Sequence, residues 1–502
     1  MRNLFLFLTS LICCVFISNA QSFIGFGTDN YSGIYGVINN PAHIADSRHC
    51  MDINLIGTSF FVNNTYYNAR VLGYARKVVE FEDSSGFDNF LTTTDADRKN
   101  YFAGNLDVLG PSILYSLDDK QSIGLTSRIR NFVNLNGIND EIISFFEEDQ
   151  LDMLSPVSVI YDELSIVQNT VSEIGLSYAR VLQDNATHFW KAGLSLKYLS
   201  GIASTKFNAN DLLFVYVPDA TGAPSTVALD GSATASFSNS LDSNEDYLPI
   251  SGGDRIDFKS ETSGIGLDLG IIYEYRPDYR AAYSKDHVKN QVRRRDLNLY
   301  KLKAGVSLLD LGRLTYKNTS DIQIGFNDIN STNLRSTDYT NDIEPFLSTI
   351  KSRGTQKYVL PARLESFVDY YYKKNYYFSL ETSLSFVGKN NPNANRYVNR
   401  ITLNPRYERK HFAFHSPISY VQHSGLQWGF TMRLGPITMG SSSFVNHVVR
   451  GFDKQFDFFM ALKIPILHQP PNENPDLPTC MDCPNKSEVK VDRPKGYEGF
   501  EK

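Results

Sequence analysis

Apolar and polar residues alternate along several segments of the chain. From Ile265 to Tyr275 every second residue is Ile, Leu or Tyr, and most residues between them are small or charged. Successive side chains of a strand point to opposite faces, so such a segment has one apolar and one polar face. Segments of about ten alternating residues separated by turns are typical of a transmembrane β-barrel. The same period returns at Trp190–Tyr198, Tyr300–Leu308, Tyr376–Phe386, Leu426–Leu434 and Phe456–Ile466.

The connections between these segments alternate between short and long. Counting back from a last strand at Gln455–Leu467 to a first at Met51–Asn63 gives about fourteen strands, an even number as single-chain bacterial barrels have. The sequence therefore predicts an all-β fold, a transmembrane antiparallel β-barrel spanning residues 51–467. Short turns then lie on the periplasmic side, and one long connection, 276–298, also falls there. The long polar segments predicted as outer loops are 64–104, 136–171, 204–261 and 317–362.

Both ends of the chain differ from the barrel. Residues 1–20 have a basic start, an apolar core of Leu4 to Ile17 and a Ser18-Asn19-Ala20 cleavage pattern, which predicts a signal peptide. Lipidation at Cys13 or Cys14 is the minor alternative, because neither cysteine follows a small residue. Residues 468–502 contain six prolines and predict a disordered periplasmic tail, either a tether for a partner or an extension without one.

Composition bears on binding to nucleic acid, on the membrane interfaces and on metal or redox sites. The 502 residues carry a net charge of −6, which gives no general attraction to nucleic acid. Tyr and Phe are abundant and Trp is rare, and aromatic residues would form girdles at the two membrane interfaces. Cys480 and Cys483 could close a small disulfide, whereas a redox motif needs a βαβ context and zinc needs four ligands. We expect no metal and no cofactor.

Charged residues on the polar faces of the strands are expected to line the lumen. Charges of both signs can line an aqueous route, or they can pair with each other and with a hatch. The candidates are Arg128, Arg130, Lys191, Lys197, Asp268, Glu274, Lys301, Lys303, Glu381, Arg433 and Lys463.

Two further segments carry open alternatives. A basic patch of Arg293, Arg294 and Arg295 in the periplasmic connection is either a docking site for an acidic partner or a solvated loop. Asn139–Asp149 predicts a short amphipathic helix in an outer loop.

The sequence contains no local motif of the common catalytic sites. The chain has no Gly-x-Ser-x-Gly elbow, phosphate loop or His-Glu-x-x-His. His411 and His415 share a strand face, and two histidines without a carboxylate partner make a poor metal site. We therefore expect no enzymatic activity.

A glycine-rich leader precedes the first strand and ends in Asn39-Asn40-Pro41-Ala42. This arrangement resembles the long-chain fatty-acid channel superfamily, in which the leader folds into the lumen as a hatch and the barrel has fourteen strands. The resemblance implies that residues 21–50 form an N-terminal luminal hatch with Asn40, Pro41 and Ala42 as its motif.

Four strand segments resemble Bacteroidota members of that group more closely. These include the barrel that shuttles cargo in type IX secretion and a related family of unknown function. The segments are Gly264–Gly270, Leu302–Leu308, Leu360–Leu364 and Gly429–Gly435.

Two functions remain open from the sequence. The first is an interaction or assembly barrel of the Bacteroidota outer membrane, associated with secretion and bound to periplasmic or secretion-complex proteins. The alternative is a channel for uptake or export of hydrophobic or amphiphilic small molecules, with a hydrophobic ligand. In both cases outer-membrane lipid surrounds the barrel.

Overall fold

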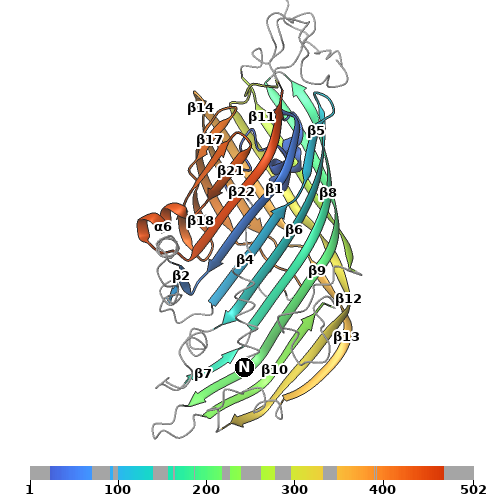
Figure 1. The fold of residues 1–502 in the computed structure, drawn as a ribbon, viewed down its shortest axis with the longest axis vertical. Helices are drawn as coiled ribbons and strands as arrows, with labels where there is room; N and C mark the ends of the chain where they lie inside the picture. Colours follow the sequence, from blue (N-terminus) through green and yellow to red (C-terminus); the bar gives the residue numbers. More distant parts are fainter. Residues whose placement is uncertain are drawn as a thin grey trace, which may run out of the picture.

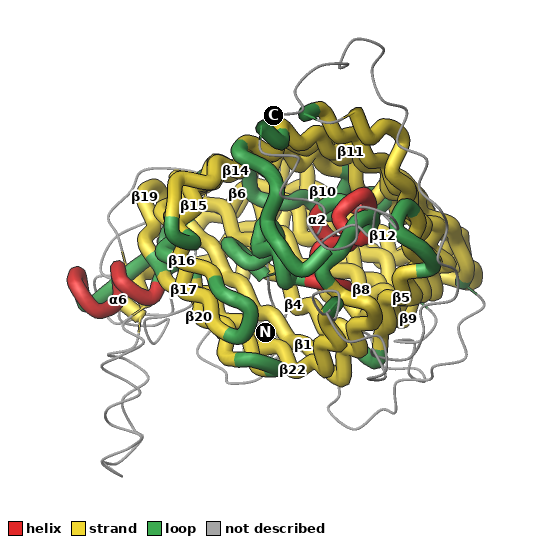
Figure 2. Tube along the Cα trace, turned by 90° about the horizontal axis from the view of Figure 1, so that it is seen from above, coloured by secondary structure: helices red, strands yellow, loops and turns green. Residues whose placement is uncertain are grey.

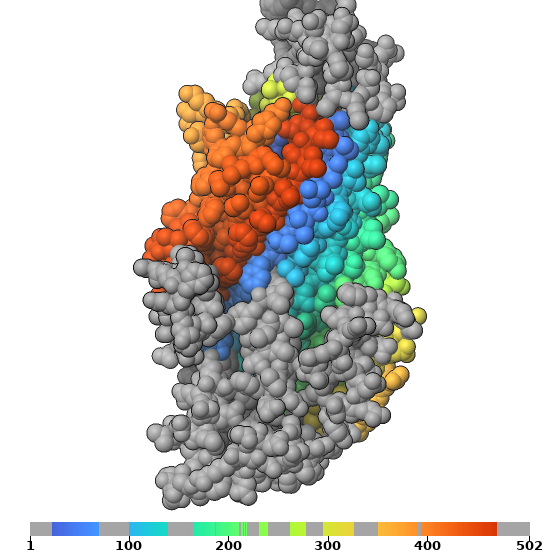
Figure 3. Space-filling model, in the orientation of Figure 1, coloured from blue at the N-terminus to red at the C-terminus, as the bar shows by residue number. Residues whose placement is uncertain are grey.

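Strands dominate the computed structural model of the chain, which describes residues 23–69, 91–93, 100–138, 157–161, 164–185, 187–217, 226–238, 262–277, 295–331, 347–388, 391 and 393–468. Within these ranges fourteen strands form a closed antiparallel barrel. The ring closes where β1 (His49–Asn64) pairs with β22 (Gln455–Leu467). In Figure 3 the blue strand β1 lies directly against the red strand β22. The predicted barrel of about fourteen strands is confirmed.

Three crossings of the wall are each made of two short strands in line, namely β4/β5, β17/β18 and β19/β20. The other strands of the ring run unbroken. Besides β1 and β22, the ring contains β4 (Asn100–Leu109), β5 (Ser112–Ser116), β6 (Gln121–Ile138), β8 (Leu164–Asn185), β9 (His188–Val217), β11 (Ser263–Tyr275), β12 (Leu302–Ser331), β14 (Arg363–Lys373), β15 (Tyr376–Ser385), β16 (Arg400–Glu408), β17 (Phe412–His415), β18 (Ile418–Val421), β19 (Gly425–Trp428), β20 (Phe430–Leu434) and β21 (Ile437–Ser441).

The wall has an apolar outer face and a polar inner face, as the alternation predicts. In β11 the side chains of Ile265, Leu269 and Ile271 are exposed on the outside, whereas Asp268 and Glu274 are buried inside. An exposed apolar face of this extent suits hydrocarbon and not water. Among the described helices, none is long and apolar enough to cross a membrane.

The wall is much taller on one side than on the other (Figure 1). Strands β8, β9 and β12 have 22, 30 and 30 residues, whereas the crossings β17/β18 and β19/β20 span only residues 412–421 and 425–434, and β21 has five residues. The tall side continues through β7 (Val157–Tyr161), β10 (Thr226–Phe237) and β13 (Leu347–Val359). A separate two-stranded sheet joins β2 (Tyr67–Ala69) and β3 (Leu91–Thr93).

These extensions correct the prediction of loops in 204–261 and 317–362. The segments "TVALDGSATASF" of β10 and "LSTIKSRGTQKYV" of β13 pair with β9 and β12. In β10 the alternating apolar residues Ala233, Ala235 and Phe237 are buried, and the exposed face is polar. Most of β13 is polar on both faces. Neither strand therefore has the outward apolar face that predicts a membrane-facing strand. The predicted strand over Ile437–Val445 also ends early, because Phe444–Arg450 forms the helix α6.

Several predicted features lie outside the described residues. They are the signal peptide, the loop helix at Asn139–Asp149, Arg293 and Arg294 of the basic patch, Cys480 with Cys483, and the proline-rich tail after residue 468.

The short connections meet at one end of the barrel, here named the short-turn end. They include the turns between β14 and β15 and between β20 and β21. Residues 23–48, here named the hatch, fold into the lumen at this end. The hatch contains three short helical turns, η1 (Gly33–Tyr35), α2 (Gly36–Asn39) and η2 (Pro41–Ile44). Figure 2 shows these turns in red inside the yellow ring of strands.

Candidate functional site

The Asn-Pro-Ala motif folds as the start of η2. The Asn40 side chain accepts a hydrogen bond from the backbone N–H of Ala42 at 2.9 Å and so caps the turn. Pro41 occupies the first helical position, where its missing N–H costs nothing. The three residues therefore give the hatch a fixed local shape before it contacts the wall.

Two wall glycines receive this motif. A Cβ on Gly270 would lie 2.1 Å from Oδ1 of Asn40, and a Cβ on Gly193 would lie 2.5 Å from the backbone nitrogen of Ala42. Nδ2 of Asn40 donates to the carbonyl of Val306 at 3.2 Å. The close approach of the hatch to the backbone of β9 and β11 therefore requires residues without a side chain.

Asp29 of the hatch binds two wall side chains. Its Oδ2 lies 3.1 Å from Nε2 of His415 and 3.2 Å from Nε of Arg433, and all three side chains are buried. Burial alone would raise the pKa of Asp29, but Arg433 and His415 outweigh burial and hold this pKa well below its usual range. Asp29 therefore stays ionised and fastens the hatch to β17 and β20.

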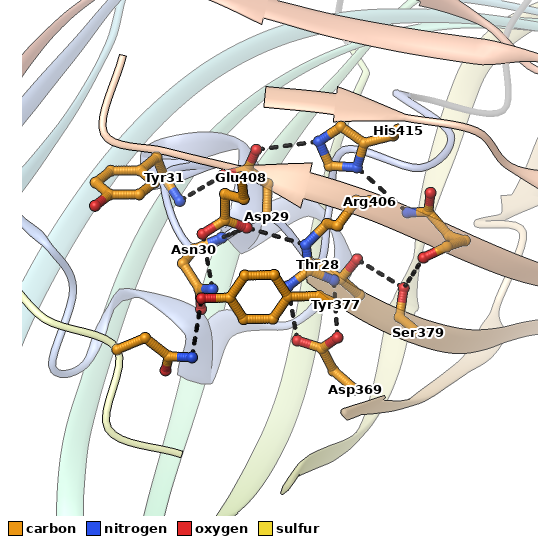
Figure 4. A network of polar contacts seen from close by, with 12 residues as sticks. Thr28, Asp29, Asn30, Tyr31, Asp369, Tyr377, Ser379, Arg406, Glu408 and His415 are labelled. Atoms are coloured by element: carbon orange, nitrogen blue, oxygen red, sulfur yellow. Dashed lines mark hydrogen bonds and ion pairs between the residues drawn. The ribbon is translucent and has the colours of Figure 1, made fainter. Parts of the chain in front are cut away.

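Neighbouring hatch residues bind wall carboxylates, as Figure 4 shows. The hydroxyl of Thr28 donates to Glu381 at 2.8 Å, and the Asn30 side chain donates to Glu408 at 2.9 Å. The backbone N–H of Asn30 also donates to Glu408 at 3.2 Å. Three consecutive polar residues thus bind strands on one side of the barrel.

Wall lysines satisfy carbonyl groups of the hatch. Nζ of Lys463 donates to the carbonyls of Tyr31 and Ser32 at 2.8 and 3.0 Å. Nζ of Lys191 donates to the carbonyl of Ala45 at 3.0 Å. These carbonyls have no strand partner, so the wall side chains supply the bonds that a buried backbone needs.

The hatch also has an apolar side that packs on an apolar part of the wall. Hatch residues Phe23, Phe26, Ile34, Tyr35, Val37, Ile38, Ile44 and Ala45 belong to one buried cluster with the wall. We name the wall part of this cluster the apolar seat. It consists of Leu109, Leu114, Ala179, Val181, Phe189, Phe459 and Ala461.

A break in the wall lies beside the apolar seat. Between β4 and β5 the pairing is interrupted at Gly110, and Nδ2 of Asn54 donates to the carbonyls of Leu109 and Gly110 at 3.1 and 2.7 Å. The hydroxyl of Tyr35 in the hatch donates to Oδ1 of the same Asn54. Hatch and wall break therefore share one chain of hydrogen bonds.

A network of charged side chains crosses the lumen beyond the hatch. Arg130 makes two hydrogen bonds to Asp310, at 2.9 and 3.0 Å, and also binds Glu173. Lys197 and Arg363 reach the same Asp310 at 2.7 and 3.1 Å. Because these residues come from β6, β8, β9, β12 and β14, the network links distant parts of the wall and fills the lumen.

Asp268 joins this network, since its carboxylate lies 2.7 Å from Nζ of Lys197 and accepts from the backbone N–H of Asp310. Arg128 binds Asp107. Glu274 binds Lys191 at 3.2 Å and Arg276 at 2.5 Å.

Lys301, just before β12, and Lys303, within it, lie in different surroundings. Nζ of Lys303 lies 3.2 Å from Oδ1 of Asn30 in the hatch. Lys301 stays near the outside, where its ammonium lies over the ring of Tyr370 and donates to the carbonyl of Tyr372. The structure therefore does not bring Lys301 together with the other candidates.

Arg295 of the basic patch faces inward. Its guanidinium donates to the carbonyl of Asp118 at 3.1 Å and to the hydroxyl of Ser116 at 3.0 Å, and it lies 3.9 Å from Asp46. These contacts hold the segment after residue 294 against the hatch and the turn between β5 and β6. Arg295 is thus engaged within the barrel.

A second segment enters the lumen from the opposite end. Asn395 donates to Asn134 at 3.0 Å and to the carbonyl of Val167 at 2.8 Å, and the ring of Tyr397 packs on Phe132. Both Asn395 and Tyr397 are buried. The hatch therefore occupies the lumen at the short-turn end, and Asn395 and Tyr397 occupy it beyond the charged network.

Sequence reasoning missed several residues of the site. Asp29, Thr28 and Asn30 form a polar run within an otherwise apolar, glycine-rich leader, and that run was the available signal. Asp310 sits at a positive φ of 60° in a strand irregularity, where the alternation rule loses its register. In the described part of the chain, no group of three or more His, Cys, Asp or Glu side chains could hold a metal ion.

These observations define a plugged transmembrane β-barrel whose N-terminal hatch is bound to the lumen wall. A family model described as "Family of unknown function (DUF5723)" matches residues 41–442, and the chain belongs to this family. Among curated proteins, none matches the chain.

Solved structures of other barrels are similar over most of their length. A TodX deltaS2S3 mutant monoaromatic hydrocarbon channel has 11% identity and a TM-score of 0.42, covering 87% of this chain and 95% of that one. The P. putida toluene transporter TodX has 9% identity and a TM-score of 0.41, with coverage of 88% and 95%. A Pseudomonas aeruginosa FadL homologue has 10% identity and a TM-score of 0.36, with coverage of 87% and 94%. At such scores these likenesses carry no argument about the function of this chain.

Proposed function

We propose that the protein is a gated passage for hydrophobic or amphiphilic small molecules in a Gram-negative outer membrane. The short-turn end faces the periplasm, and the hatch is the gate. In the arrangement described above the passage is closed.

The apolar seat is the observation that carries this proposal. Most of the lumen is lined by polar and charged side chains, yet one part of the wall under the hatch, the apolar seat, is apolar. Displacing the hatch would expose this surface to water, and each buried Val, Leu or Phe side chain contributes about 1.5–3 kcal/mol when it is covered. An apolar solute can replace the hatch there, whereas an ion or a sugar gains nothing from such a surface.

The width of the barrel supports the same function. A barrel of about eight strands is filled by its own side chains, whereas wider barrels need a plug or contain a channel. A barrel built only as an anchor would not need a separate segment to close it. The hatch contributes no strand. Tyr35 connects it to Asn54, which binds the wall break at Gly110, so displacement of the hatch would remove the hydrogen bond between Tyr35 and Asn54.

Entry of a hydrophobic fluorescent dye into Gram-negative host cells that carry the protein tests this proposal. Wild-type protein should accelerate entry. The double variant Leu114→Thr with Val181→Thr makes the apolar seat polar and should slow entry several-fold.

The control for this experiment is Val171→Thr with Leu314→Thr, which places the same change in a different buried cluster. Its dye entry should equal that of the wild type at matched expression. Equal entry in cells with and without the protein would refute the proposal.

A role in secretion or envelope assembly is the other function considered from the sequence. Arg295, its candidate docking residue, is engaged inside the barrel. Assignment of the protein to the Bacteroidota envelope and to secretion rests on the sequence resemblance alone. We therefore place the passage function first.

A further inference from the structure

Arg48, the last residue of the hatch, lines a cavity at the short-turn end between the hatch and residues 295–300. The side chain is only 9% exposed. Its guanidinium lies 5.5 Å from the ring of Tyr31, but no described residue accepts a hydrogen bond from it, and the carboxylate of Glu408 acts on its charge only from beyond ion-pair distance. The guanidinium nitrogens are not among the fully enclosed polar atoms that lack a partner, so they are open to the cavity, where the oxygens of an anion can accept from them.

The charges around the cavity are unbalanced. Three acidic side chains, those of Asp29, Asp46 and Glu274, face five basic ones. The basic side chains are Arg48, Lys191, Arg276, Arg295 and Lys303.

The acidic side chains are already bound to other groups. Glu274 accepts from Arg276 and pairs with Lys191 at 3.2 Å, and Asp46 pairs with Arg276 at 2.7 Å. Asp29 binds strands on the far side of the hatch, as described above. None of the three carboxylates lies within ion-pair distance of Arg48.

Lys303 is only weakly neutralised. Its Nζ lies 3.8 Å from Asp369, which itself accepts two hydrogen bonds of 2.8 Å from Arg406. His43 also lines the cavity, and burial together with Lys303 lowers the pKa of His43 well below its usual value, so this ring is neutral. Arg48 and Lys303 therefore leave a positive potential in the cavity.

We propose that this cavity binds one small oxyanion of about the size of phosphate, with Arg48 as its principal donor. The cavity volume of about 40 Å³ compares with roughly 10–15 Å³ for one water molecule, so it has room for a phosphate group. Arg binds phosphate and carboxylate oxygens through two parallel N–H groups. A bound anion would connect the hatch to β12 and stabilise the closed barrel by mass action. This proposal does not depend on transport.

Calorimetric titration of the full-length, folded barrel in detergent with inorganic phosphate tests the site. We expect saturable binding with one site per barrel. Arg48→Gln should weaken binding at least tenfold, and Arg48→Lys should weaken it less. The matched control is Arg180→Gln, an exposed arginine on β8 near the same end, which should bind as the wild type does.

A second titration with octyl phosphate distinguishes a free anion from the head group of an amphiphile. Arg48-dependent binding of both compounds assigns the site to the free anion, and Arg48-dependent binding of octyl phosphate alone assigns it to a head group. Absence of binding by both compounds, or binding unchanged in Arg48→Gln and Arg48→Lys, would overturn the proposal. The titrations measure binding in the Arg48 cavity and not passage through the barrel, so this failure would leave the transport proposal intact.

Discussion

Replacing Gly270 by alanine tests how the hatch is held. The added Cβ would lie 2.1 Å from Oδ1 of Asn40 and 3.0 Å from Cδ of Pro41. Ordinary contacts need about 3.4 Å or more, so the hatch motif must move by about 1 Å. The wall itself cannot retreat easily, because Gly270 is paired on both sides, with Gly193 and Ser307.

The size of the effect follows from the bonds that this movement breaks. Asn40 loses its hydrogen bonds to the carbonyls of Ile271 and Val306, at 3.4 and 3.2 Å. Each contributes about 0.5–1.5 kcal/mol net, and an overpacked contact costs about 1–3 kcal/mol. Opening of the hatch should therefore become easier by about 2–6 kcal/mol, which is about 30-fold or more in its equilibrium.

Hydrogen–deuterium exchange of peptides from residues 23–46 measures this opening. In Gly270→Ala these peptides should exchange at least about 30-fold faster than in the wild type, while strand peptides stay unchanged. The matched control is Gly388→Ala, because a Cβ there meets nothing within 4 Å. A folded Gly270→Ala barrel whose hatch exchanges at the wild-type rate would refute the reasoning.

Three other predictions use the same geometry. Asp29→Asn leaves Arg433 buried without its carboxylate, so the hatch should be less stable by about 3–5 kcal/mol in the same exchange experiment. Since the folded pKa of Asp29 is depressed, its stabilisation is complete above the unfolded value and should be lost as pH falls below about 4; wild-type hatch exchange that stays constant there would contradict the ion pair. Arg130→Leu leaves Asp310 and Glu173 without their main partner and should lower the denaturant midpoint of the barrel, whereas Arg180→Leu on the exposed surface should not. Trp190 and Trp428 are exposed on the outer face, so lipids brominated in their acyl chains should quench both fluorophores, and unquenched emission would argue against a lipid-facing wall.

The strands of the wall could be predicted from the sequence because the alternation of apolar and polar residues is a local pattern. Contact with lipid on one side and the lumen on the other imposes a period of two, and this rule places Asp268 and Glu274 inside. The rule fails where a strand has no lipid face. Strands β10 and β13 show this, since they pair with neighbours at the end opposite the short turns and present mostly polar residues to the outside.

The hatch could be predicted only in outline. The Asn-Pro-Ala motif indicates a leader that enters the lumen, but it does not say which wall residues it meets. The partners of Asp29 are more than 380 residues away, at His415 and Arg433, and no local pattern connects them. Gly193 and Gly270 look like ordinary small residues in strands until the hatch is seen against them.

The most direct test of the account is the rate of hydrophobic dye entry through the outer membrane of host cells carrying wild type, Gly270→Ala or Gly388→Ala at equal expression. If the hatch gates an apolar passage, Gly270→Ala should admit dye several-fold faster than the wild type, and Gly388→Ala should match the wild type. A Gly270→Ala barrel whose hatch is released, as shown by exchange, but whose dye entry is unchanged would contradict the central claim.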